Sequence, residues 1–149
     1  MPLPTAAQRD PQWDTLFYGH ASAEEAVTAL ILAERRATID RDVSLLTQLW
    51  SEDALIVDGR NSVTPSDDYV WRGRAAILDR YQVAVFPFDL PPLDTLATGT
   101  AITITGNAAT VRHGGDQWHF IKTDQRWWLA ALHYQLPPAE NERQPPLTD

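Results

Sequence analysis

Two neighbouring aromatic segments near the C-terminal end constrain the fold most. Residues 117–123 and 126–134 flank the polar pair Asp124-Gln125 and predict a β-hairpin. Side chains of a strand alternate between its two faces. In the second segment, strict alternation gives two sets, which are Trp127, Leu129, Ala131 and His133 on one face and Trp128, Ala130, Leu132 and Tyr134 on the other. Because both sets are apolar or aromatic, we expect helices to cover one face and a second copy of the chain to cover the other, as a homodimer.

The first half of the chain predicts three helices and a short strand. Ser22 and Glu25 form a capping box at the start of a helix that runs to about residue 39. Asp42 is positioned to cap a short second helix, and Gly73 precedes a third, which runs through Tyr81. Between them, residues 54–57 predict a buried strand, preceded by a turn at residues 51–53. Helices followed by strands indicate an α+β fold.

More antiparallel strands precede the hairpin. Residues 96–105 alternate in polarity, Gly106-Asn107 is a turn signal, and residues 108–113 resume a strand. Tyr69-Val70-Trp71 predicts one further short strand. Gly114-Gly115 fits either a tight turn or a bulge within one long strand.

Composition excludes several classes of protein. The 149 residues contain no cysteine, which rules out disulfides, thiolate metal ligands and cysteine nucleophiles. The net charge of -8 disfavours nucleic acid and anionic membranes as partners. No apolar run reaches the ~18 residues of a membrane span, and the first residues lack the pattern of a secretory signal. We therefore expect a soluble, cytoplasmic protein.

The chain divides into three parts by composition. Residues 1–21 form a proline-rich N-terminal arm, residues 22–136 form the folded domain, and residues 137–149 form a polar tail that we expect to be mobile. The arm carries the aromatic residues Trp13, Phe17 and Tyr18. These rings are expected to dock on the core, and a lid over a pocket mouth is the alternative.

Three stretches resemble the nuclear transport factor 2-like superfamily, and most of all its SnoaL-like and ketosteroid isomerase-like branch. They are Leu49 to Asp58, Gly73 to Ile77 and Arg126 to Trp128. The resemblance implies a cone-shaped, cystatin-like α+β fold, in which three N-terminal helices pack on a curved, mostly antiparallel sheet around a pocket. Members of the superfamily include isomerases, dehydratases, cyclases and non-enzymatic binding modules, so the fold alone does not choose a function.

Alignment of this sequence with ketosteroid isomerases, residue by residue, predicts part of a catalytic site. Asp58 falls on the general-base aspartate of ketosteroid isomerases, Glu34 falls on their oxyanion-donating tyrosine, and Gln117 falls near their protonated aspartate. Two of the three family groups are therefore replaced. The same alignment turns one set of side chains toward the pocket: Gln117, His119, Ile121, Trp128, Ala130, Leu132 and Tyr134. It turns another set toward the dimer side: Trp118, Phe120, Trp127 and His133.

Each candidate acid has two interpretations. In the first, Asp58 lies in an apolar cleft, where burial raises its pKa and makes it a usable base. In the second, Asp58 caps the turn that begins at Gly59. Glu34 follows Leu30 and Ile31 at helical spacing, which places it on the apolar face of the first helix. It could donate a proton opposite Asp58, or pair with an arginine at the rim.

The remaining candidates are polar or aromatic. His119 could relay a proton or bond within the sheet, and Gln117 could donate to a substrate oxygen or lie at an edge. The ligand-binding candidates are Gln117, Trp71, Tyr81, Trp128, Leu132 and Tyr134. His113, His119 and His133 lack the tight spacing of metal ligands, and the alignment sends His119 and His133 to opposite faces, so we expect no metal.

Three functions remain open. The first is an isomerase, dehydratase or cyclase without cofactor, in which Asp58, His119 and Glu34 catalyse acid–base chemistry on a small apolar carbonyl or hydroxyl compound. The second is a non-catalytic module that binds a small molecule in the same pocket. The third is a dimeric assembly domain whose cone is filled by side chains.

Overall fold

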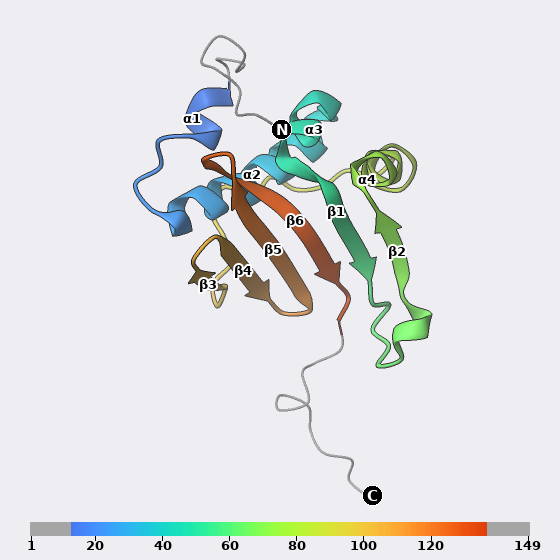
Figure 1. The fold of residues 1–149 in the computed structure, drawn as a ribbon. Coiled ribbons are helices and arrows are strands. Elements are labelled where there is room, and N and C mark those ends of the chain that lie inside the picture. Colours follow the sequence, from blue (N-terminus) through green and yellow to red (C-terminus); the bar gives the residue numbers. More distant parts are fainter. Residues whose placement is uncertain (1–12, 137–149) are drawn as a thin grey trace, which may run out of the picture.

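A computed structural model describes residues 13–136 of the chain (Figure 1). Its α-helices are α1 (Asp14–Phe17), α2 (Ala23–Asp40), α3 (Val43–Leu49) and α4 (Arg74–Arg80). A 3-10 turn, η2 (Pro65–Asp67), and a π-helical turn, η3 (Tyr81–Val85), complete the helical elements. The strands are β1 (Trp50–Asp58), β2 (Tyr69–Arg72), β3 (Ala101–Thr105), β4 (Ala108–His113), β5 (Asp116–Thr123) and β6 (Arg126–Tyr134).

Local sequence signals set the helix starts. The Ser22 hydroxyl accepts the amide N–H of Glu25 at 3.1 Å, and the Glu25 carboxylate accepts the amide of Ala21. The Asp42 carboxylate accepts the amide of Leu45 at 3.0 Å and begins α3. Both predicted caps are confirmed, because each side chain satisfies an amide that the first helical turn leaves unpaired.

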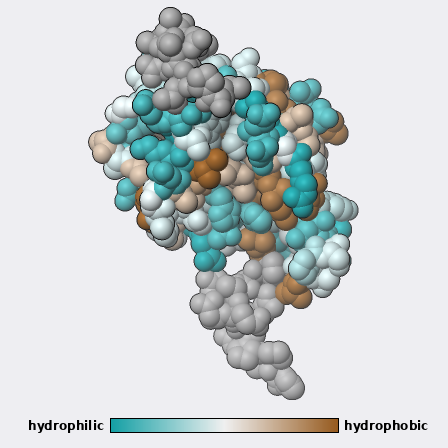
Figure 2. All heavy atoms as spheres, in the orientation of Figure 1, coloured by the Kyte–Doolittle hydropathy of each residue, from teal (hydrophilic) through white to brown (hydrophobic). Residues whose placement is uncertain are grey.

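One mostly antiparallel sheet holds the strands in the order β2-β1-β6-β5-β4-β3. Only the central pair, β1 with β6, is parallel among the described strands. Figure 1 shows α2 crossing behind the sheet, while no helix crosses the face turned toward the viewer. Figure 2 shows that this open face carries apolar surface interrupted by hydrophilic residues. The helices and sheet confirm the expected α+β architecture.

Some boundaries differ from the expectation. Strand β1 begins at Trp50, so the turn expected at residues 51–53 is wrong, and the chain instead shifts its register against β6 between Trp50 and Leu55. Strand β3 begins only at Ala101. The pair Gly114-Gly115 is a turn that joins β4 to β5, since His113 pairs with Asp116 across it.

An irregularity in β6 reverses the expected assignment of faces. His119 pairs with Ala131 but Phe120 pairs with Leu129, so Ala130 is an extra, bulged residue. Beyond a bulge the alternation shifts by one residue, so Leu129 and Leu132 lie on the same side. The expected inward set is therefore wrong for Gln117, His119, Ile121 and Trp128, and the expected outward set is wrong for Trp118, Phe120 and Trp127.

The core lies between α2, α3, α4 and the concave side of the sheet. Its largest fully buried side chains include Trp50, Tyr81 and Phe120. The indole of Trp118 stacks on that of Trp50, with ring centroids 6.4 Å apart. These rings fill much of the space between helices and sheet.

The described part of the N-terminal arm docks on this core. Phe17 is buried, and Trp13 and Tyr18 pack against the buried cluster. The first part of the arm and the predicted mobile tail, residues 137–149, lie outside the described residues. None of the helices within residues 13–136 combines the length and apolarity that a membrane crossing requires.

Candidate functional site

The guanidinium of Arg80 lies among three aromatic rings, which come from β2, η3 and β6. It is 5.1 Å from the ring centre of Trp71, 5.2 Å from that of Tyr134 and 5.8 Å from that of Tyr81. We refer to Trp71, Arg80, Tyr81 and Tyr134 as the Arg80 cluster. Trp71, Arg80 and Tyr134 are partly exposed. A ligand can therefore approach the Arg80 cluster from solvent.

Arg80 has free hydrogen-bonding capacity. Its guanidinium carbon lies over the rings of Trp71 and Tyr134, where a cation is attracted to π-electrons. Among residues 13–136, no carboxylate or carbonyl accepts a hydrogen bond from its N–H groups. An arginine carries five N–H donors in one plane, so the edge of this guanidinium is available to an oxygen acceptor.

Behind Arg80, Tyr81 joins a chain of buried hydrogen bonds. Its hydroxyl donates to Glu34 Oε2 at 2.5 Å and accepts from Trp50 Nε1 at 3.2 Å. Thr38 donates to the same Glu34 oxygen at 3.2 Å. Helix α2 supplies the acid, η3 the phenol and β1 the indole, so the network joins three elements. A π-helical turn such as η3 is often found at functional sites.

Burial sets the electrostatics of this network. Glu34 is partly buried, and the loss of water around its carboxyl group raises its pKa, although the hydrogen bonds from Tyr81 and Thr38 act in the opposite direction. Burial raises the pKa of Tyr81 well above its ordinary value, and the neighbouring Glu34 raises it further. Burial thus favours the neutral form of Glu34 more than in a free glutamate, and its carboxyl group accepts a hydrogen bond from a phenol.

Asp58 lies at the end of β1, on the same side of the strand as the buried Ile56. Its Oδ1 accepts the amide N–H of Arg60 at 2.9 Å, within a turn where Arg60 and Asn61 both have positive φ. Neither Glu34 nor His119 hydrogen-bonds to Asp58 in the described part of the chain. The observed hydrogen bond is the turn-capping arrangement, and a catalytic role for Asp58 stays a prediction.

The structure places His119, Gln117 and Trp128 on the open face of the sheet, away from the Arg80 cluster. The rings of His119 and His133 lie 5.3 Å apart, so the expectation that they point to opposite faces is wrong. Burial lowers the pKa of His119, and the neighbouring His133 lowers it further. The indole N–H of Trp128 is buried without a hydrogen-bond partner in the described structure.

The structure thus brings together four of the candidate residues and separates the others. Trp71, Tyr81 and Tyr134 meet around Arg80, and Glu34 joins them through Tyr81. Leu132 lies in the core. Arg80 itself was not predicted from the sequence, although it follows the buried Ile77 by three residues, a spacing that places both on one face of a helix.

The described residues offer no obvious metal site. Nowhere within residues 13–136 do three histidine, aspartate or glutamate side chains gather closely enough to hold an ion. The chemistry available at the Arg80 cluster is therefore that of a cation, aromatic rings and a buried acid–phenol pair.

Comparison with known proteins identifies the fold. No protein-family model matches the sequence, and no curated protein matches it either. Among solved structures, a nuclear transport factor 2-like superfamily protein from Salmonella enterica has a TM-score of 0.56 and 19% sequence identity, over 76% of this chain and 90% of its own.

Two further solved structures agree. A nuclear transport factor 2-like protein with a cystatin-like fold from Novosphingobium aromaticivorans has a TM-score of 0.56 and 18% identity, over 80% of this chain and 86% of its own. A proposed ketosteroid isomerase from Parabacteroides distasonis has a TM-score of 0.52 and 16% identity, over 81% of this chain and 92% of its own. The chain therefore has the nuclear transport factor 2-like fold, which confirms the resemblance and the expected architecture.

Proposed function

We propose that this chain, with its nuclear transport factor 2-like fold, binds a small, mostly apolar molecule that carries a carbonyl or carboxylate oxygen. The observation that carries this proposal is the guanidinium of Arg80, held against Trp71 and Tyr134 with its N–H edge unpaired among the described residues. The aromatic rings would contact the flat body of the ligand, and Arg80 would donate to its oxygen. Leu132 and Tyr81 extend the apolar wall behind them.

The energetics favour an oxygen acceptor at this position. A cation over an aromatic ring is stabilised by about 0.5–2 kcal/mol, which holds the guanidinium in place without neutralising its charge. A hydrogen bond from a charged donor contributes about 1.5–3 kcal/mol when formed. The position of Arg80 is thus prepared in advance of binding, which reduces the entropy lost when a ligand docks.

Catalysis is a second candidate function, favoured by the 2.5 Å hydrogen bond between Tyr81 and Glu34. In this proposal the protein is an isomerase, dehydratase or cyclase that needs no cofactor. Tyr81 would turn its hydroxyl from Glu34 to the ligand oxygen and donate its proton there as negative charge develops, a neutral Glu34 would replace that proton on the Tyr81 oxygen, and Arg80 would stabilise the charge. Asp58 would act as the base, which requires it to leave its hydrogen bond with Arg60.

Binding is tested with Arg80→Gln against a panel of flat apolar ketones and carboxylic acids, using ligand-observed NMR. Loss of one charged donor should weaken binding by about 10- to 100-fold. The matched control is Arg72→Gln, which removes the same charge from an exposed neighbour of Trp71 on β2. Equal affinities for Arg80→Gln and wild type would exclude the Arg80 cluster as the binding site.

Catalysis is tested separately with Asp58→Asn and Tyr81→Phe on any ketone or acid that binds. Turnover should fall by two orders of magnitude or more, about the contribution of a general acid or base, while binding persists. If both variants keep wild-type turnover, the acid–base mechanism is excluded. If no panel compound is turned over but several bind at Arg80, the non-catalytic binding module is the correct function.

A further inference from the structure

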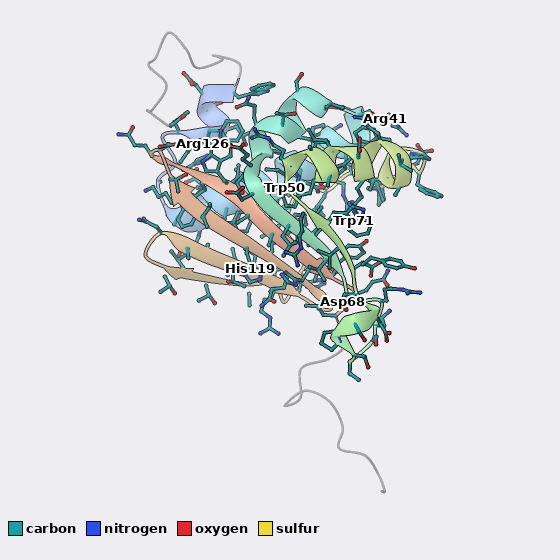
Figure 3. The ribbon with its side chains drawn as sticks, turned by 45° about the vertical axis from the view of Figure 1, so that its right-hand side comes forward. Arg41, Trp50, Asp68, Trp71, His119 and Arg126 are labelled. Carbon is teal, nitrogen blue, oxygen red and sulfur yellow. The ribbon has the colours of Figure 1, made fainter. Side chains whose placement is uncertain are left out.

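A pocket lies at the opposite end of the fold from Asp58, where the connection between α1 and α2 meets the tip of the β5–β6 hairpin. Its volume is about 300 Å³. The residues that line it are Phe17, Tyr18, Gly19, His20, Ala21, Ser22, Ala23, Ala26, Lys122, Gln125, Arg126 and Trp127. We call it the Arg126 pocket after its buried arginine, whose side chain is labelled in Figure 3. Its size is at the lower end of the range found for small-molecule sites.

The lining of the Arg126 pocket has a one-sided charge. It contains two cations, Lys122 and Arg126, together with His20, and no aspartate or glutamate. The whole chain has 20 acidic and 12 basic residues, so an acid-free lining runs against the overall balance. Lys122 is also the single lysine of the sequence. Such a lining attracts an anion although the protein as a whole is negative.

Arg126 supplies a buried positive charge. It is 5% exposed, and its guanidinium lies between the rings of Phe17 and Trp128, 3.6 Å from each ring centre. It donates hydrogen bonds to the backbone carbonyls of Gln48 and Trp127. Across the described residues, no carboxylate forms an ion pair with it. These contacts hold the cation in place without a carboxylate in direct contact, while Tyr18 and Asp124 act on its charge electrostatically.

Burial lowers the pKa of Arg126 to about 9, so the guanidinium is still protonated at neutral pH. A buried charge is unfavourable unless it is paired, and an anion in the adjoining pocket would pair with Arg126 more directly than Asp124 does.

Glu25 and Asp124 are close in sequence to the lining of the Arg126 pocket but are not part of it. Glu25 accepts the amide of Ala21 and lies 3.7 Å from His20 Nδ1, so the start of α2 engages it. Asp124 lies in the hairpin turn beyond Lys122, where positive φ angles at Asp124 and Gln125 reverse the chain. His20 is held by a hydrogen bond of 2.5 Å from its Nε2 to the carbonyl of Leu16.

We propose that the Arg126 pocket binds a small molecule through a carboxylate or phosphate group, at a site separate from the Arg80 cluster. Arg126 provides the fixed buried charge, Lys122 closes on the anion from β5, and the rings of Phe17 and Trp127 contact the rest of the ligand. An oxyanion is the favoured chemistry because both cations donate N–H bonds and the lining offers no carboxylate.

The single lysine permits a direct test on the intact chain. Reductive methylation with ¹³C-formaldehyde labels Lys122 and the N-terminal amine, and keeps the positive charge of both. Inorganic phosphate and succinate are titrated separately, with sodium chloride holding the ionic strength constant. A saturable shift of the Lys122 signal is expected with at least one of them, and the responding probe identifies a phosphate or a carboxylate ligand. Linear shifts with both probes would overturn the proposal.

Variants distinguish a built site from general attraction between charges. In backbone amide spectra, Lys122→Gln should weaken binding of the responding anion by about threefold to fivefold. Arg112→Gln removes the same charge from an exposed position on β4 and should leave the affinity unchanged. An equal loss in both variants would overturn the proposal. Arg80→Gln should also leave the affinity for the responding anion unchanged. A weaker affinity in that variant would show that the Arg126 pocket and the Arg80 cluster are not separate sites.

Discussion

The hydroxyl of Tyr81, which is buried, donates a hydrogen bond of 2.5 Å to the carboxyl group of Glu34, which is partly buried. The bond links η3 to α2, two elements far apart in the sequence. It also places a polar contact in the core, directly behind the partly exposed Arg80 cluster. We therefore expect the stability of the protein to depend on this contact.

Replacing Tyr81 by Phe should destabilise the fold. The change leaves the indole N–H of Trp50 and the Glu34 carboxyl group without their shared partner. Unsatisfied buried groups cost about 1–3 kcal/mol in the free energy of unfolding, measurable by urea denaturation. Tyr69→Phe is the control, since Tyr69 is 52% exposed, and it should change stability by less than about 0.5 kcal/mol. Similar losses in the two variants would contradict the prediction.

Glu34 should make the protein less stable as pH rises. Its pKa is raised above the ordinary 4.5 in the folded state, so the folded state binds more protons than the unfolded state between those two values. Stability from this group is present below about pH 4.5 and is lost as pH rises through the folded pKa. The variant Glu34→Gln lacks this titration. Its stability relative to wild type should therefore increase with pH, as measured by urea unfolding from pH 4 to 8. A difference that does not vary with pH would contradict this.

The bulge at Ala130 makes a prediction about neighbouring residues of β5. Phe120→Ala should cost about 3–5 kcal/mol, because Phe120 is fully buried beneath the helices. Ile121→Ala, next along the strand and 37% exposed, should cost about 1 kcal/mol or less. Both are compared by denaturation at the lowest usable protein concentration, so that association contributes least. If Ile121→Ala lost more stability than Phe120→Ala, the faces of β5 predicted from strict alternation would be correct instead.

The open face of the sheet predicts a homodimer. Val70 and Ile121 contribute exposed apolar surface to it, and none of the helices within residues 13–136 covers it. Ile121→Arg should convert a dimer to a monomer, because it introduces two charges at a self-complementary interface. Light scattering at micromolar concentration tests this, with Val83→Arg, an exposed position on η3, as the control. A monomeric wild-type protein would exclude the dimer.

Local signals in the sequence predicted much of the fold. The caps at Ser22 and Asp42 and the turn at Asp124-Gln125 depend on a few adjacent residues, so they could be identified without knowledge of the rest. The bulge at Ala130 could not, because it depends on how β5 and β6 pair along their whole length. A single extra residue was enough to move His119 and Trp128 to the wrong side of the predicted sheet.

The candidate site was less predictable than the fold. Helical spacing correctly placed Glu34 toward the core, but its partner Tyr81 lies 47 residues further along the chain. For Arg80 the sequence offered only its helical spacing from Ile77, which is weaker evidence for a role in a site. Its aromatic neighbours Trp71 and Tyr134 come from separate strands. Contacts of this kind become visible only when the strand order is known.

The parallel pairing of β1 with β6 joins the first strand of the sheet to the last. During synthesis, β1 and β2 must therefore wait until almost the whole chain has left the ribosome before their central neighbour is available. Non-local pairing of this kind slows folding and leaves a strand edge open to aggregation in the meantime. A chain that ended before residue 126 would keep every helix described here and still lack the strand that unites the two halves of its sheet.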